Sequence, residues 1–200
     1  MKAYLCAMAL LMTAPLVSAQ DFDGEISRVI VGGSGGFFRI SHDDFSGVYD
    51  SRSSFIPSGH ALLQIKAPYN VIAKYRRFEK DRTAIIDNVA TNLQWEQSFL
   101  NLGLRYVSYS ERKFTQFFGF GVSLMNIQES GPLSVVTDNG GKRDATGFYI
   151  EVGTDYRFIR RAAFFFEIEI SSAGVEGKSA FEGTSVGGYY LALGMNLFLL

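Results

Sequence analysis

The sequence has little cysteine, proline or histidine and almost no net charge, and these shortages exclude several classes of protein. Its single cysteine, Cys6, has no partner for a disulfide or for a cysteine-based zinc site. A formal net charge of −1, without a cluster of lysine and arginine, does not fit a nucleic-acid-binding surface. What the chain does contain, 21 glycines and 14% aromatic residues beside only four prolines, favours an all-β fold with many turns.

Long apolar runs are confined to the amino terminus. Lys2, the apolar stretch from Tyr4 to Leu16 and the tripeptide Val17-Ser18-Ala19 have the order of a secretory signal with its cleavage site. We expect residues 1–19 to be a signal peptide and residues 20–200 to form one domain. No later segment is apolar over 18 residues, so the sequence predicts no membrane-spanning helix.

Several stretches carry apolar side chains at every second position, which is typical of β-strands with two different faces. The clearest are Phe148–Tyr156, Phe164–Ile170 and Tyr189–Leu197, where glycines, small polar groups and charges alternate with the apolar set. Alternation and turn signals together predict eight strands, at residues 26–40, 58–67, 69–79, 92–109, 112–127, 145–157, 161–173 and 186–199.

The predicted connections alternate between long and short. In an up-and-down meander, all the long loops then share one rim and all the tight turns share the other. Barrels of the outer membrane have this arrangement, with long extracellular loops and short periplasmic turns. The sequence therefore predicts an all-β fold, an eight-stranded antiparallel up-and-down transmembrane β-barrel. The long loops are expected at residues 41–57, 80–91, 128–144 and 174–185, and the tight turns near 67–69, 110–111 and 159–160.

A soluble lipocalin-like barrel would show the same alternation with its faces reversed, the apolar set inside. The non-apolar set is too rich in glycine and aromatic residues, and too poor in charge, for a solvated exterior. This favours an apolar set that faces lipid. Aromatic residues also gather near both predicted ends, where the two membrane interfaces would lie. They are Tyr106, Tyr109, Tyr156 and Phe158 at the tight-turn end, and Trp95, Phe148 and Tyr189 at the long-loop end.

Three segments carry a wider pattern: Phe45-x-x-x-Tyr49 in the first loop, Tyr69–Phe78 in the third strand, and the last strand with Gly194 and its alternating leucines. They resemble the small eight-stranded outer-membrane barrels of the OmpA/OmpX-like type, in the version called the outer membrane protein β-barrel domain. The chain departs from that pattern in ending on Leu200, where an aromatic residue is usual. The resemblance implies the outer membrane of a Gram-negative bacterium. Its expected partners are the lipid bilayer, lipopolysaccharide, the barrel-assembly machinery and periplasmic chaperones.

Charged residues of the non-apolar set form the first candidate site. An eight-stranded barrel has an interior only wide enough for side chains to fill, and buried charges are tolerated when they are paired. We therefore expect a network of ion pairs that fills the lumen, and the alternative is a narrow pore for small solutes. The residues are Lys74, Arg76, Arg105, Glu151, Asp155, Glu167 and Glu169.

Apolar side chains in the long loops form the second candidate site, because they would meet an unidentified ligand outside the cell. They are Phe45, Tyr49, Ile85, Ile86, Val135 and Phe181.

An enzyme is the competing interpretation. Ser58 and His60 lie two residues apart and would share one face of a strand, so the alternative function is a lipid A deacylase or acyltransferase at the rim. The sequence surroundings of those enzymes are absent. Gly32–Gly36 lacks the Lys-Ser/Thr of a phosphate loop, and Asp43-Asp44 lacks the spacing of a calcium loop. We expect no enzyme, no cofactor and no metal, and a structural or surface-interaction role.

Overall fold

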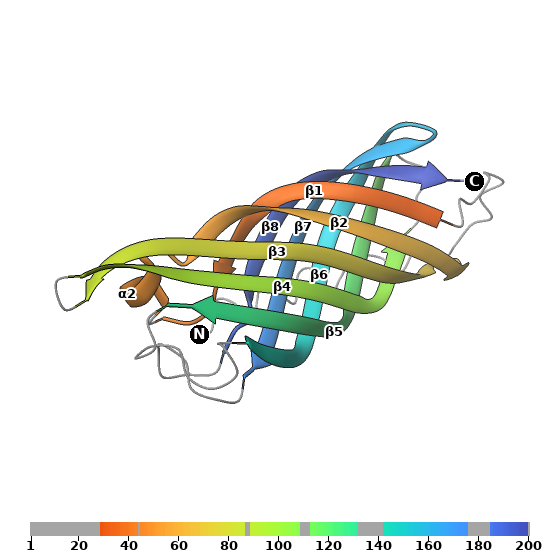
Figure 1. Cartoon of the computed structure of the whole chain (residues 1–200). Coiled ribbons are helices and arrows are strands. Elements are labelled where there is room, and N and C mark those ends of the chain that lie inside the picture. The colour runs from red at the N-terminus through yellow and green to blue at the C-terminus, as the bar shows by residue number, and fades with distance from the viewer. Residues whose placement is uncertain are drawn as a thin grey trace, which may run out of the picture.

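Eight antiparallel strands close into a barrel in which each strand pairs with the next and the last pairs with the first (Figure 1). The structure is a computed structural model that describes residues 29–43, 45–86, 89–108, 113–131, 142–175 and 185–199. In this part of the chain, no helix is long and apolar enough to cross a membrane. The elements are β1 (Val29–Ile40), α2 (Phe45–Tyr49), β2 (Ser53–Lys66), β3 (Tyr69–Ile86), β4 (Val89–Ser108), β5 (Phe114–Ser130), β6 (Lys142–Ile159), β7 (Ala162–Gly174) and β8 (Gly188–Leu199).

Side chains alternate between a buried and an exposed face over most of the sheet, apart from the glycine-rich start of β1 and residues 152–155 of β6. In β7, Phe164, Phe166 and Ile168 are exposed, whereas Glu167 and Glu169 are buried. The outward face is therefore apolar and charged side chains lie inside, the reverse of a soluble barrel. This confirms the predicted fold class.

The exposed apolar side chains form a continuous belt around the barrel, which we call the apolar belt. A soluble monomer rarely exposes an apolar patch of more than a few hundred Å², but a membrane covers such a belt with hydrocarbon. A closed barrel can cross that hydrocarbon because its strands satisfy each other's backbone groups. Members of the belt include Phe37, Phe55, Leu63, Val71, Tyr75, Leu100, Leu102, Leu104, Phe118, Phe120, Val122, Leu124, Phe148, Ile150, Phe164, Phe166, Ile168, Ile170, Tyr189, Leu191, Leu193, Met195 and Leu197.

The strands at the long-loop end extend further than the alternation of apolar residues does. Residues 80–91 were expected to form a loop, but Lys80 pairs with Trp95 and the ladder continues to Ile86 opposite Val89. Likewise, β2 begins at Ser53 instead of residue 58. The physical reason in β3 is that residues 79–83 are charged or polar on both faces, while the backbone pairing with β4 continues. The apolar signal then ends before the strand does.

Trp95 was expected at the membrane interface, and this expectation was wrong. Its side chain is buried, because positions 95, 97, 99 and 101 of β4 all face the interior. Trp95 belongs to an aromatic core in the outer half of the lumen, which also contains Phe38, Phe78 and Phe99. The interior therefore has two layers, charged at mid-barrel and aromatic towards the long-loop end.

Candidate functional site

Lys74, on β3, is the centre of the charged layer. Its Nζ lies 2.6 Å from Glu151 Oε2 and 3.0 Å from Glu169 Oε2, and it also pairs with Glu167. The Lys74 side chain is 1% exposed. One ammonium group therefore binds carboxylates from β6 and β7 on the opposite wall of the lumen.

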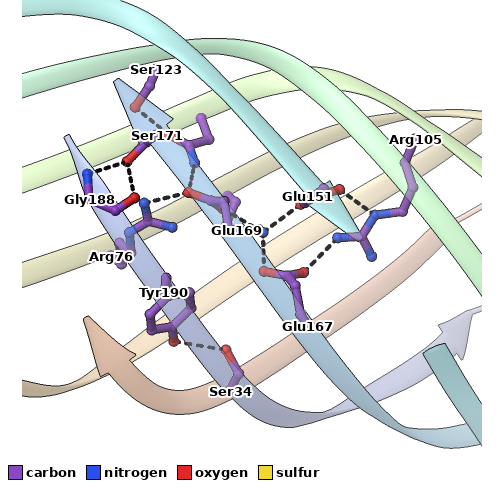
Figure 2. A network of polar contacts seen from close by, with 12 residues as sticks. Ser34, Arg76, Arg105, Ser123, Glu151, Glu167, Glu169, Ser171, Gly188 and Tyr190 are labelled. Atoms are coloured by element: carbon purple, nitrogen blue, oxygen red, sulfur yellow. Dashed lines mark hydrogen bonds and ion pairs between the residues drawn. The ribbon is translucent and has the colours of Figure 1, made fainter. Parts of the chain in front are cut away.

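Two arginines complete the pairing (Figure 2). Arg105, on β4, places Nε 2.6 Å from Glu151 Oε1 and Nη2 2.9 Å from Glu167 Oε2. Arg76, on β3, places Nη2 2.5 Å from Glu169 Oε1. Each of the three carboxylates thus contacts two cations.

Aromatic rings and neutral polar groups enclose these pairs. The guanidinium of Arg105 lies 4.0 Å from the centre of the Phe117 ring, and that of Arg76 lies 4.5 Å from the Phe99 ring. Asn101 Nδ2 donates a hydrogen bond of 2.9 Å to Glu169, and Ser123 Oγ donates one of 2.6 Å to Asn101. Because the six charged groups carry three positive and three negative charges, the layer is neutral, which is the condition for burying it. We call these six residues the lumen network: Lys74, Arg76, Arg105, Glu151, Glu167 and Glu169.

Gly119 makes room for the network. It lies directly opposite Glu151 in the β5–β6 ladder. A Cβ at this position would overlap the side chain of Glu151. This glycine, which alternates with the apolar side chains of β5, therefore has a role in packing that its place in the sequence did not reveal.

Asp155 stands apart from the other six candidates. Among the described residues it forms no ion pair, and Asn196 Nδ2 donates a hydrogen bond of 2.8 Å to its Oδ1. Asn196 Oδ1 in turn lies 2.7 Å from His60 Nε2. A cavity of about 20 Å³ adjoins Asp155, Asn196 and Arg105 at the tight-turn side of the network. It has room for about one water molecule.

The contacts around Lys74 are those of an ion-pair network. Oxygens of the three network glutamates approach within 4.8 Å of one another, as they would around a metal ion, but Lys74 contacts all three. Ser58 and His60 are both buried inside the barrel. Ser58 Oγ has no hydrogen-bond partner in the described part of the chain, and His60 is bonded to Asn196. Ser58 and His60 therefore share no hydrogen bond in this structure.

The short helix α2 covers the aromatic layer at the long-loop end. Phe45 stacks on Tyr49 with ring centres 4.7 Å apart and meets Trp95 edge-on at 5.4 Å. Tyr49 Oη donates a hydrogen bond of 3.2 Å to Glu129 Oε1, and Arg143 Nη2 lies 2.8 Å from Glu129 Oε2. Burial, reinforced by the Glu129 carboxylate, raises the pKa of the Tyr49 hydroxyl above its ordinary value. We call α2 and these contacts the outer cap.

This position of Phe45 and Tyr49 differs from the expectation that they would meet an external ligand. Both side chains are almost completely buried. The reason is that residues four apart lie on the same face of a helix, so both rings reach the aromatic layer together. Of the other loop candidates, Ile85 is 78% exposed near the tip of the β3–β4 hairpin. Ile86 ends β3, and its side chain is outside the described part, as are residues 135 and 181.

No protein-family model and no curated protein matches this sequence. Solved structures do match it. Neisserial surface protein A matches with a TM-score of 0.62 and 11% identity, covering 86% of this chain and 98% of that one. The outer membrane protein OprG from Pseudomonas aeruginosa matches with a TM-score of 0.58 and 16% identity, covering 88% of this chain and 98% of that one.

A third match is Ail, the attachment invasion locus protein of Yersinia pestis, solved in complex with the heparin analogue sucrose octasulfate. Its TM-score is 0.50 at 10% identity, covering 84% of this chain and 97% of that one. At these identities the matches establish the fold, which is that of the small eight-stranded outer-membrane barrels and confirms the predicted resemblance. This fold and the apolar belt place the chain in a bacterial outer membrane.

Proposed function

We propose that the protein is an integral outer-membrane barrel with a filled lumen, which acts structurally or through its outer surface and is neither an enzyme nor a pore. The observation that carries this proposal is the lumen network. Six charged side chains pair across the barrel at mid-height, and a conducting path would have to separate them. Separating buried ion pairs costs several kcal/mol because each partner is left uncompensated.

Conductance measurements test the filled lumen. The purified chain, refolded until its gel mobility depends on heating, is added to planar lipid bilayers. We expect no sustained stepwise conductance, whereas reproducible steps from the folded barrel would contradict the proposal and favour the small-solute pore.

The β3–β4 hairpin is the proposed interaction surface (Figure 1). The β2–β3 ladder ends at Ser58 opposite Arg76, but β3 and β4 remain paired for ten residues more, to Ile86. In the part of the chain that the structure describes, no strand therefore lies beside residues 77–86 of β3 on the β2 side. Such an edge offers unpaired backbone groups to a partner strand.

The charges on this hairpin influence the kind of partner. Arg77 pairs with Glu79 and Glu96, and the described part of the long-loop end carries as many acids as cations. Ail was solved with an acidic heparin analogue, but a charge-balanced surface does not select such a ligand. We propose a partner that binds by backbone pairing along residues 77–86.

Hydrogen exchange tests this surface without a known partner. Amide exchange is compared between the protein in its native outer membrane and the purified protein in phospholipid nanodiscs. We expect slower exchange in the native membrane at alternate amides of residues 77–86, and no difference at residues 162–171, which are paired on both sides. Equal exchange of the hairpin in both preparations would contradict the proposed partner.

The absence of catalysis has its own test. Ser58→Ala and His60→Ala should leave the lipid A and phospholipid profiles of the cell unchanged, with barrel folding verified by heat-dependent gel mobility. A changed lipid profile in cells that carry a correctly folded variant would contradict this proposal and favour the lipid-modifying enzyme.

Biogenesis completes the proposal. We propose that residues 1–19 are removed as a signal peptide, that periplasmic chaperones and the barrel-assembly machinery deliver the chain, and that lipopolysaccharide surrounds its outer half. The alternating leucines of β8 support the step at the assembly machinery. Mass spectrometry of the mature protein tests the first point, since its amino terminus should be Gln20.

A further inference from the structure

The two ends of the barrel differ in charge. Cations and acids are equal in number among the described residues at the long-loop end, and many of them are paired. The cations are Arg39, Arg52, Arg77, Lys80, Arg82, Lys142 and Arg143, and the acids are Asp43, Asp50, Glu79, Asp81, Glu96, Glu129 and Asp144. The described part of the tight-turn end has Lys66, Lys113, Arg157, Arg160 and Arg161 and no exposed acid.

Four of these five cations gather on one side of the tight-turn rim. The backbone N–H of Arg157 donates to the carbonyl of Lys113 at 2.8 Å, which joins the end of β6 to the start of β5. The N–H of Phe198 donates to the carbonyl of Arg161 at 2.9 Å, and the Arg157 guanidinium lies 4.2 Å from the centre of the Phe198 ring. Arg160 and Arg161 form the turn between β6 and β7. We call Lys113, Arg157, Arg160 and Arg161 the basic sector.

Paired aromatic rings lie on the lipid-facing surface next to the basic sector. Phe114 and Tyr156 have ring centres 4.8 Å apart, and Phe158 and Phe164 stack at 4.5 Å. All four side chains are exposed. Exposed aromatic rings favour the boundary between hydrocarbon and headgroups, so the cations beside them lie at the level of the lipid phosphates.

We propose that the basic sector binds the headgroup of an anionic phospholipid in the periplasmic leaflet, with the acyl chains against the two aromatic pairs. The proposal rests on the membrane insertion described above, but not on the lumen or the hairpin. Guanidinium groups match phosphate oxygens in geometry and charge. The two aromatic pairs beside the sector belong to the lipid-facing surface, which fits a ligand that carries acyl chains better than a soluble anion.

Lipid titration tests the site. The folded full chain is titrated in uncharged detergent with phosphatidylglycerol and, separately, with phosphatidylcholine, and bound lipid is counted by native mass spectrometry. Each cation near an anionic lipid surface strengthens binding by about fivefold, so the variant Arg160→Gln/Arg161→Gln should lose on the order of 20-fold in affinity for phosphatidylglycerol. These two positions lie in a turn outside the strands, and heat-dependent gel mobility verifies folding.

The matched control is Arg77→Gln/Lys142→Gln, which removes two exposed cations at the opposite end and should leave the affinity unchanged. Added inorganic phosphate should compete only weakly, because it cannot contact the aromatic pairs. Three results would overturn the proposal: equal binding of the two lipids, an unchanged affinity in Arg160→Gln/Arg161→Gln, or full competition by inorganic phosphate.

Discussion

The lumen network and the outer cap fill the same barrel by different physical means. The network consists of strand residues whose charges neutralise one another, so each member depends on the others. The outer cap consists of aromatic contacts from α2, a loop helix that lies on the barrel without joining the sheet. The difference shows which part of the barrel unfolds cooperatively. Loss of one network charge affects a whole buried layer, whereas the outer cap can detach by local unfolding.

The largest effect is expected from Lys74→Met. This change leaves Glu151, Glu167 and Glu169 with one cation fewer inside the barrel, and breaking a buried pair costs about 3–5 kcal/mol. Urea unfolding in micelles should show this loss of free energy. Ser172→Ala, at an exposed position of β7, is the control and should stay within about 0.5 kcal/mol of the wild type. An equally small effect of Lys74→Met would mean that the network does not hold the charged layer together.

A double-mutant cycle measures the pairing itself. Arg105→Met and Glu151→Gln should each destabilise the barrel, but together they should cost less than the sum, with a coupling of about 1–3 kcal/mol. The reason is that the second change removes the charge which the first leaves unpaired. The same cycle between Arg105 and Glu129, which lies in the outer cap, should be additive within about 0.5 kcal/mol. Additive effects in both cycles would mean that the charges of the lumen network are no more strongly coupled to each other than to the outer cap.

A smaller effect on stability is expected in the outer cap. Phe45→Ala removes the ring that packs between Tyr49 and Trp95. Because α2 can detach without opening the barrel, the free energy of global unfolding should fall by less than with Lys74→Met. The emission of Trp95, the only tryptophan, should nevertheless shift to the red as water reaches it. A loss of stability equal to that of Lys74→Met would show that the cap belongs to the cooperative core.

The smallest effect is a pH dependence of the cap. Burial raises the pKa of Tyr49, so the neutral hydroxyl is favoured while the cap is docked. The contribution to docking is complete below the ordinary tyrosine pKa of about 10 and is lost as the pH rises above it. The emission of Trp95 should therefore change above pH 10 in the wild type and much less in Tyr49→Phe. Identical pH profiles would contradict this account of the cap.

The sequence predicted what depends on local alternation. Because Leu100, Leu102 and Leu104 were expected to face lipid, Asn101 and Arg105 were expected to face the interior. The same alternation, continued along the whole of β4, would have predicted that Trp95 faces the interior as well. Eight strands and the inward charged set followed from such patterns, without reference to distant contacts.

Features that depend on contacts between distant segments could not be predicted in this way. Asp155 lies four residues after Glu151 on the same strand and is on the same, inward face. The register of the neighbouring strands nevertheless places it beside Asn196 and not beside a cation. The docking of α2 depends on Trp95 and Glu129, some 50 and 80 residues away in the chain. The polar part of β3 beyond residue 79 carries no apolar alternation, so only the pairing with β4 reveals it.

The most direct test of the account is a scan of accessibility along β4. Single cysteines at positions 98–106, carrying nitroxide labels in lipid nanodiscs, are exposed to oxygen, which enters hydrocarbon, and to a water-soluble nickel complex. Labels at Leu100, Leu102 and Leu104 should favour oxygen strongly, and the label at Asn101 should be protected from both reagents. Labels at the leucines that respond mainly to the nickel complex would contradict a barrel with its apolar belt in lipid and its lumen filled by paired charges.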